Sequence, residues 1–139
     1  MSERSLKDCA TFRSTLPEDA EWNEKGDPVV PGGKGVAAAL GQILENHGFQ
    51  PTEPSQHSYY GRQIEIRTPE CRVECIVQDL DPWVLLTTCK SRLFKRKEGD
   101  RFHVSVLSAL VEGLEADERF TEVYWASRKQ LAEEGKFKA

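Results

Sequence analysis

Cysteines are the first residues in this chain whose chemistry could define a site, and their spacing argues against a metal centre. Cys71 and Cys75 lie four residues apart in an alternating apolar run. In one β-strand they would be separated by about 13 Å, whereas two ligands of one zinc ion lie within about 4 Å of each other. Cys89 would face Cys71 across a hairpin if the connecting loop had an odd length, and Cys9 has no fixed place. We therefore interpret the cysteines as packed free thiols, and we predict no metal and no cofactor.

A histidine close to two tyrosines is the next candidate. His57, Tyr59 and Tyr60 follow a polar loop, and all three side chains can donate or accept hydrogen bonds in a small pocket. The same cluster is also typical of the start of a strand. We retain a small-pocket enzyme near His57 as the third functional hypothesis, and we predict no catalytic residues.

The segment PGGKG at 31–35 is similar in composition to a phosphate-binding turn before a helix. A phosphate loop needs a longer spacing from glycine to lysine and a Ser or Thr after the lysine, and Gly35 follows Lys34 here. We interpret this segment as a glycine-rich entry into a helix.

Basic residues are concentrated in a single run, Lys90–Arg101, within an otherwise acidic chain. Lys95, Arg96 and Lys97 could contact the phosphates of RNA or an acidic partner. The alternative is a solvated connector in which Leu93 and Phe94 dock on the core. The sequence leaves these interpretations open.

The stretch Arg62–Lys90 predicts the elements that would position these residues. Three runs rich in β-branched and alternating residues are separated by turns that contain Pro69 and Pro82. Proline has no backbone N–H to donate, so each proline marks an interruption of the strand ladder. We predict an antiparallel meander of three strands.

Helical periodicity predicts one helix on either side of this meander. Apolar residues recur at helical spacing in Val36–His47, and Gly48 stands where a left-handed residue ends a helix. His47 is interpreted as a capping residue of that helix. A second apolar stripe predicts a helix over Arg101–Glu115, with Asp100 as its cap.

The C-terminal part of the chain predicts a fourth strand around 123–125. A short helix follows it and begins at the capping box of Ser127 and Gln130. The predicted fold is therefore α+β in the order α-β-β-β-α-β-α. Its sheet is mainly antiparallel, a three-strand meander plus a fourth strand, and two amphipathic helices cover one face.

Residues 1–33 are rich in proline and glycine but also contain apolar residues such as Trp22. We predict an extended or partly ordered N-terminal arm that docks on a single α+β domain spanning 34–139. The chain has 139 residues and 38% hydrophobic residues, which suits one domain. A net charge of −4 argues against general nucleic-acid binding, and the absence of a long apolar run and of a secretory signal favours a cytoplasmic protein without a membrane span.

We expect the loop at 79–82 to hold two or four residues, and either even length pairs Val77 with Val84. That register would turn one set of apolar side chains away from the helices. The resulting patch is a predicted site for a protein partner or for a second copy of the chain in a homodimer. Its residues are Ile76, Trp83, Leu85 and Tyr124.

The order of elements over Val36–Leu114 resembles that of the double-stranded-RNA-binding domain. In order, acidity and size the chain is also similar to small secretion chaperones and to toxin-neutralising immunity proteins of bacteria. These resemblances imply a protein or RNA partner. The leading functional hypothesis is a small non-enzymatic protein-binding protein, and the alternative is an RNA-binding module that uses Lys90–Arg101.

Overall fold

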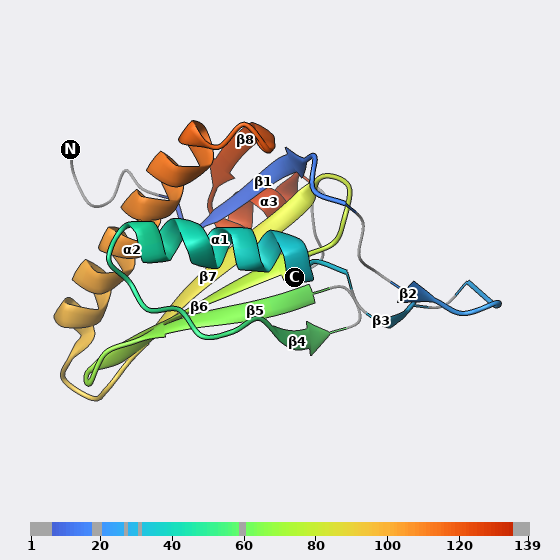
Figure 1. The fold of residues 1–139 in the computed structure, drawn as a ribbon. Helices are drawn as coiled ribbons and strands as arrows, with labels where there is room; N and C mark the ends of the chain where they lie inside the picture. Colours follow the sequence, from blue (N-terminus) through green and yellow to red (C-terminus); the bar gives the residue numbers. More distant parts are fainter. Residues whose placement is uncertain (1–6, 18–20, 27, 31, 59–60, 135–139) are drawn as a thin grey trace.

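The computed structural model describes residues 7–17, 21–26, 28–30, 32–58 and 61–134. It is an α+β fold, as predicted, with an antiparallel six-stranded sheet and three helices (Figure 1). The strand count and the order of elements differ from the prediction. The elements are β1 (Cys9–Ser14), β2 (Glu21–Trp22), β3 (Pro28–Val30), α1 (Lys34–Asn46), β4 (Ser55–Ser58), β5 (Gly61–Arg67), β6 (Cys71–Gln78), β7 (Trp83–Ser91), α2 (Arg96–Ala116), β8 (Phe120–Ala126) and α3 (Arg128–Glu133).

The N-terminal segment supplies an interior strand of the main sheet. The strand order is β4-β5-β6-β7-β1-β8, so β1 lies between β7 and β8 and pairs antiparallel with both (Figure 1). Cys9 lies opposite Leu86 on one side and opposite Ala126 on the other. The prediction described residues 1–33 as an extended or partly ordered arm and did not assign a sheet strand to Cys9–Ser14. The side chain of Trp22, the predicted anchor, lies outside the described residues, and β2 and β3 form a separate two-stranded sheet.

The hairpin of β6 and β7 has a different register from the predicted one. Val77 lies opposite Leu85, and Gln78 lies opposite Val84, so residues 79–83 connect the last pair. This connection has an odd length. Because side chains alternate between the two faces of a strand, a shift of one residue moves every side chain of β7 to the other face.

Helices α1 and α2 cover one face of the sheet (Figure 1). The two helices approach closely at Gly113, because a side chain there would overlap Ile43 of α1. The core between the helices and the sheet consists of fully or nearly fully buried apolar side chains. They include Phe12, Leu40, Leu44, Ile64, Ile66, Val73, Val77, Leu85, Val106, Leu110, Leu114 and Phe120.

The short helix α3 packs on the opposite face of the sheet. Leu131 is completely buried there against side chains of β1, β7 and β8, and Ile76 packs at the edge of this second cluster. Over β5, β6 and the end of β7 this face instead carries a network of polar and charged side chains. The sheet is thus covered by two helices on one face and by α3 over part of the other.

The predicted end of α1 at Gly48 and the predicted start of α3 at Ser127 are confirmed. Gly48 has a φ of 91°, and the N–H of Phe49 donates to the carbonyl O of Leu44 at 3.0 Å. His47 caps α1 through its Nδ1, which lies 2.8 Å from the carbonyl O of Ile43. The Ser127 hydroxyl accepts from the N–H of Gln130, whose side chain accepts from the N–H of Ser127. None of the described helices combines the length and the apolar character needed to cross a bilayer.

Candidate functional site

The basic segment Lys90–Arg101 is divided between a strand, a loop and a helix. Lys90 and Ser91 end β7, residues 92–95 form a loop, and α2 begins at Arg96. The helix therefore begins before the predicted start at Arg101, and Lys95 rather than Asp100 stands at its N-cap. Glu98 in the first turn favours this start because its carboxylate is stabilised near the positive end of the helix.

Gly99 explains how the first turn of α2 fits against β7. A Cβ atom at Gly99 would lie 2.9 Å from Ser91 Cβ and 3.3 Å from Cys89 Sγ. The thiol of Cys89 donates to the carbonyl O of Gly99 at 3.2 Å. The start of α2 is thereby held against the end of β7, and the loop between them stands out from the surface.

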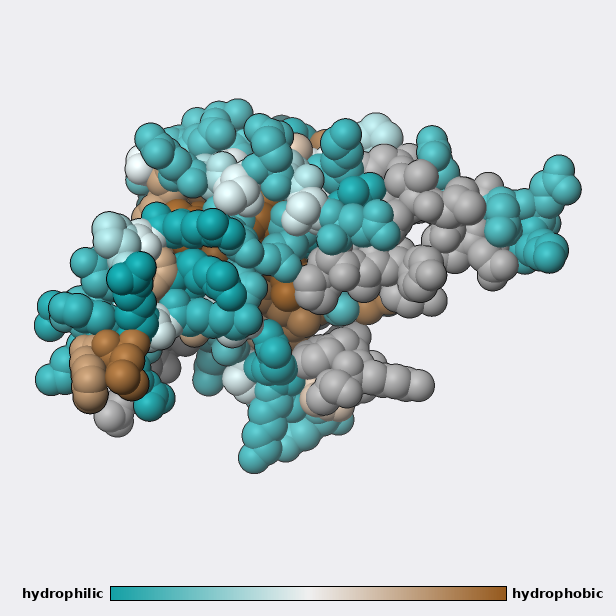
Figure 2. Space-filling model, turned by 90° about the horizontal axis from the view of Figure 1, so that it is seen from below, coloured by the Kyte–Doolittle hydropathy of each residue, from teal (hydrophilic) through white to brown (hydrophobic). Residues whose placement is uncertain are grey.

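Two large apolar side chains lie at the end of this loop and are almost fully exposed. Leu93 is 81% exposed and Phe94 is 92% exposed. At the left end of Figure 2, where the loop lies, a small hydrophobic protrusion stands among hydrophilic neighbours. The possibility that Leu93 and Phe94 dock on the core is therefore wrong. We call these two residues the Leu93–Phe94 tip.

Phe94 adopts a backbone conformation that is unusual for a bulky residue. Its φ is 68°, in the left-handed region, where an L side chain crowds the following carbonyl oxygen. In the described part of the chain, Glu122 is the other non-glycine residue with a positive φ, and it lies at an irregularity of the β1–β8 pairing. Such strained positions are concentrated at functional sites.

Exposed cations surround the tip. Arg92 precedes it, and Lys95, Arg96 and Lys97 follow it. None of the four forms an ion pair within the described ranges. The opposite end of β7 has the reverse charge, because the exposed Leu80 lies between Asp79 and Asp81. The β6–β7 hairpin therefore has an acidic turn at one end and a basic, apolar tip at the other.

A groove of about 690 Å³ lies beside the tip. We call it the β7–α2 groove. It is bounded by the end of β7, the tip and the first turns of α2, and the residue before β1 and the start of α3 complete it. Its polar lining residues include Asp8, Thr87, Arg96, Asp100, His103 and Arg128.

Thr87 and His103 form a hydrogen-bonded pair in this groove. The Thr87 hydroxyl lies 2.7 Å from His103 Nε2 and donates to the carbonyl O of Asp8 at 2.7 Å. Burial lowers the pKa of His103, and the charges of Asp8 and Asp100 oppose this shift. The neutral form of His103 is therefore favoured. Thr87, however, is only 1% exposed, and its hydroxyl already donates to Asp8. The pair connects β7, α2 and the start of β1, and it is not arranged as an accessible nucleophile and base.

The predicted cluster of His57, Tyr59 and Tyr60 falls at the edge of the sheet. His57 lies on the edge strand β4. Its side chain, together with Tyr59 and Tyr60, lies outside the described residues, so the pocket near His57 stays a prediction.

The predicted apolar patch is divided between the two faces of the sheet. Leu85 is fully buried beneath the helices, and Trp83 packs on the same core. Ile76 packs on the opposite face beside the α3 cluster, and Tyr124, which pairs with Thr11, is 41% exposed. These four residues therefore do not form one surface. The cause is the one-residue difference in the β6–β7 register.

The four cysteines are free thiols that lie on the sheet strands. Cys71 and Cys89 share the helix-covered face of the β6–β7 pair, as an odd loop requires. Burial raises the pKa of Cys75 to about 12 and that of Cys89 to about 11. In the part of the chain that is described, no group of three or more His, Cys, Asp or Glu side chains is arranged to hold a metal ion.

Sequence reasoning found the basic run but not the residues that assemble beside it. Thr87 contacts His103 across 16 positions and Asp8 across 79 positions. Arg128, at the start of α3, donates to the hydroxyl of Thr88 from 40 positions away. No motif joins residues at such separations, so only the packing of α2, α3 and β1 against β7 brings them together.

Comparison of the chain with protein-family models, with curated proteins and with solved structures gave no match. The class of the protein is therefore described from its own fold and surface features. It is an α+β protein in which a basic loop with an exposed apolar tip borders a polar groove.

Proposed function

We propose that the chain is a non-enzymatic binding protein that docks on an acidic surface of a protein partner through the Leu93–Phe94 tip. The observation that carries this proposal is the exposure of the two side chains, 81% for Leu93 and 92% for Phe94. Two adjacent large apolar side chains that are exposed to this extent do not contribute to the packing of the core. Phenylalanine and leucine become favourable contacts once a partner removes them from water.

The energetics of the tip suit an anchor. Burial of one leucine or phenylalanine side chain contributes about 1.5–3 kcal/mol. The left-handed backbone of Phe94 costs about 1–2 kcal/mol in the free protein. The contact between α2 and β7 at Gly99 holds the two ends of the loop that carries the tip. The loop therefore loses less backbone entropy on binding than a loop with free ends would lose.

The charges around the tip define the partner's chemistry. Arg92, Lys95, Arg96 and Lys97 carry four positive charges close to the two apolar side chains. A complementary surface has a small apolar pocket bordered by Asp and Glu. Opposite charges at an interface raise the association rate and select against partners of like charge. The chain as a whole has a net charge of −4 although it includes these four cations, so its remainder repels an acidic partner and favours approach with the tip first.

Affinity capture from the native host's lysate, after nuclease treatment, tests the proposal. Wild-type protein should retain a partner that Leu93→Ala/Phe94→Ala protein loses, with unchanged melting curves for both. Leu80→Ala is the matched control, because it removes an exposed leucine at the acidic end of the same hairpin. Equal retention by the tip variant and the wild type would contradict the proposal.

Salt and charge reversal define the partner further. Retention of the partner should weaken as the salt concentration rises from about 50 to about 500 mM, because exposed charges become screened over this range. Lys95→Glu/Arg96→Glu/Lys97→Glu protein should lose the partner as well. If the retained protein is a second copy of the chain, sedimentation of the purified protein will show a dimer that the tip variant lacks.

RNA is the second candidate, and the position of Phe94 among cations favours it specifically. An exposed aromatic ring in a basic setting can stack on an unpaired base, which contributes about 1–3 kcal/mol per base. Binding of duplex and single-stranded RNA at low salt would then weaken steeply as salt rises. The absence of binding at low salt would eliminate this candidate, and a partner that is retained from untreated lysate but not from nuclease-treated lysate would support it.

A further inference from the structure

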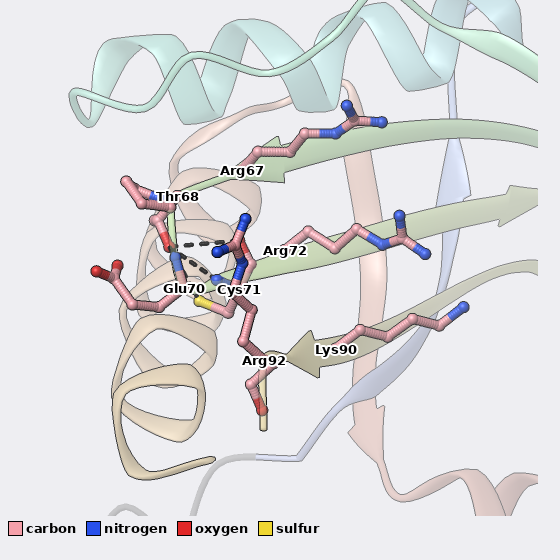
Figure 3. Close-up of a pocket in the computed structure, with 9 residues that line it drawn as sticks. Arg67, Thr68, Glu70, Cys71, Arg72, Lys90 and Arg92 are labelled. Atoms are coloured by element: carbon pink, nitrogen blue, oxygen red, sulfur yellow. Dashed lines mark hydrogen bonds between the residues drawn. The ribbon is translucent and has the colours of Figure 1, made fainter. Parts of the chain in front are cut away.

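Three basic side chains form a row across adjacent strands on the sheet face opposite α1 and α2. Arg72 of β6 lies directly opposite Arg67 of β5 on one side and opposite Lys90 of β7 on the other. Figure 3 shows the three side chains extending next to one another in the same direction. Like charges at directly opposed positions of a sheet destabilise it. Such a row needs negative charge to compensate it.

The protein supplies only part of that compensation. Glu65 accepts hydrogen bonds from Arg67 at 2.8 Å and from Gln63 at 2.8 Å. Glu74 pairs with Lys90 at 3.0 Å. Both carboxylates therefore serve the outer members of the row. Hydrogen bonding by Arg67 is the main cause of the lowered pKa of Glu65, and the charge of Arg72 is a smaller one.

The middle cation of the row lacks a partner of its own. Within the described residues Arg72 forms no ion pair, and its Nε is buried without a hydrogen-bond partner. A buried N–H without an acceptor costs free energy, and Arg72 also has a like charge on either side. An anion that accepts from the terminal N–H groups of the Arg72 guanidinium would relieve the repulsion between like charges.

A hollow of about 320 Å³ lies at this end of the sheet. The three basic side chains line it, and a fourth, Arg92, lines it from the loop after β7. In Figure 3 the Arg92 guanidinium is turned toward the β5–β6 turn, whereas Arg72 extends away from that turn. The N–H of Arg92 donates to the carbonyl O of Glu70 at 2.8 Å, which holds this loop against the β5–β6 turn. The carboxylate of Glu70 is directed away from Arg72 and Arg92 in Figure 3.

We propose that this hollow binds a phosphate group, with Arg72 as its main contact and Arg92 as the second. Guanidinium groups recognise phosphate through paired N–H donors. The volume is at the lower end of the range for small-ligand sites, which suits a phosphate group and part of the molecule that carries it. The phosphate comes either from a small phosphorylated molecule or from a nucleic-acid backbone. This site shares Arg92 with the proposed docking surface at the tip, whereas Arg72 lies outside that surface.

Thermal melting with three probes tests the proposal. The probes are inorganic phosphate, pyrophosphate and a single-stranded uridine oligonucleotide, each compared with sodium chloride at equal ionic strength. The wild type should gain several degrees in melting temperature with at least one probe, in a saturable manner, because a ligand that binds only the folded state stabilises it. Arg72→Gln should abolish the gain, and Arg92→Gln should reduce it.

Two controls separate ligand binding from a structural role. Arg13→Gln removes an exposed arginine paired with Asp81 and Glu122 elsewhere on the sheet, and it should keep the full response. Without ligand, Arg72→Gln should melt at or above the wild-type temperature, because it removes a repulsive charge. A response to phosphate or pyrophosphate identifies a small-molecule source, and a response to the oligonucleotide alone identifies a nucleic-acid source. No response to any probe, or an equal response in Arg72→Gln, would overturn the proposal.

Discussion

Gly113 of α2 faces Ile43 of α1 with no room for a side chain between the two helices. A Cβ atom at Gly113 would overlap Ile43 Cγ2 and would lie 3.2 Å from both Cβ and Cγ1 of the same residue. The contact brings the two helices close together over the shared core. A glycine that weakens α2 by its low helix propensity is therefore required by the packing of α1.

Gly113→Ala should lower the free energy of unfolding by about 1–3 kcal/mol, because the added methyl group forces the helices apart. Gly41→Ala is the matched control in α1, where a Cβ would make an ordinary contact with Pro51 at 3.6 Å. That change should raise the free energy of unfolding by about 0.5–1 kcal/mol. Urea denaturation measures both. Stabilisation by Gly113→Ala would show that the helices can separate without loss.

Phe12 should be among the most sensitive positions in the N-terminal segment. It is fully buried on β1, with its ring 5.3 Å from that of Phe120 and 6.5 Å from that of Trp83. Phe12→Ala should cost about 3–5 kcal/mol of unfolding free energy. Phe94→Ala removes the same type of side chain from an exposed position, and it should change the unfolding free energy by less than about 0.5 kcal/mol. Similar denaturation midpoints for the two variants would mean that β1 is not part of the core.

His103 should make stability depend on pH. Burial lowers its folded-state pKa below the ordinary value of 6.5, so the unfolded chain takes up the proton at a higher pH than the folded protein does. The contribution is present in full above pH 6.5 and is lost as the pH falls toward the folded-state pKa. His103→Gln removes the titration. The difference in unfolding free energy between the two proteins should therefore change below pH 6.5 and stay constant above it, and a constant difference throughout would exclude this role.

The buried cysteines should resist alkylation. Burial is the main cause that raises the pKa of Cys9 to about 11, and it raises that of Cys75 to about 12. Because the thiolate is the nucleophile, iodoacetamide at a pH of about 8 should modify both slowly in the folded protein and quickly in urea. Mass spectrometry of the peptides measures this. Reductant and chelator should leave the melting temperature unchanged, and a fall of several degrees would indicate a bridge or a metal.

Local signals in the sequence determined the end of α1 and the start of α3, although they misplaced the start of α2. Gly48 ends α1 and the Ser127–Gln130 capping box begins α3, as predicted, because both depend on hydrogen bonds between residues close in sequence. The meander of β5, β6 and β7 was also predictable, since its strands are consecutive and its turns contain proline. Capping and turn chemistry act over a few residues and can be seen without the rest of the chain.

The tertiary structure decided the faces of the sheet and the composition of the site. Trp83 to Leu86 is apolar throughout, so the pattern did not distinguish the register in which Leu85 joins the helix-covered core from the one in which Val84 does. β1 pairs with strands far along the chain, and its short sequence gave no sign of an interior position. The exposure of Phe94 follows from the contact between β7 and α2, and the position of Arg72 between Arg67 and Lys90 follows from the strand register. Register and exposure depend on contacts between distant residues, which local chemistry does not specify.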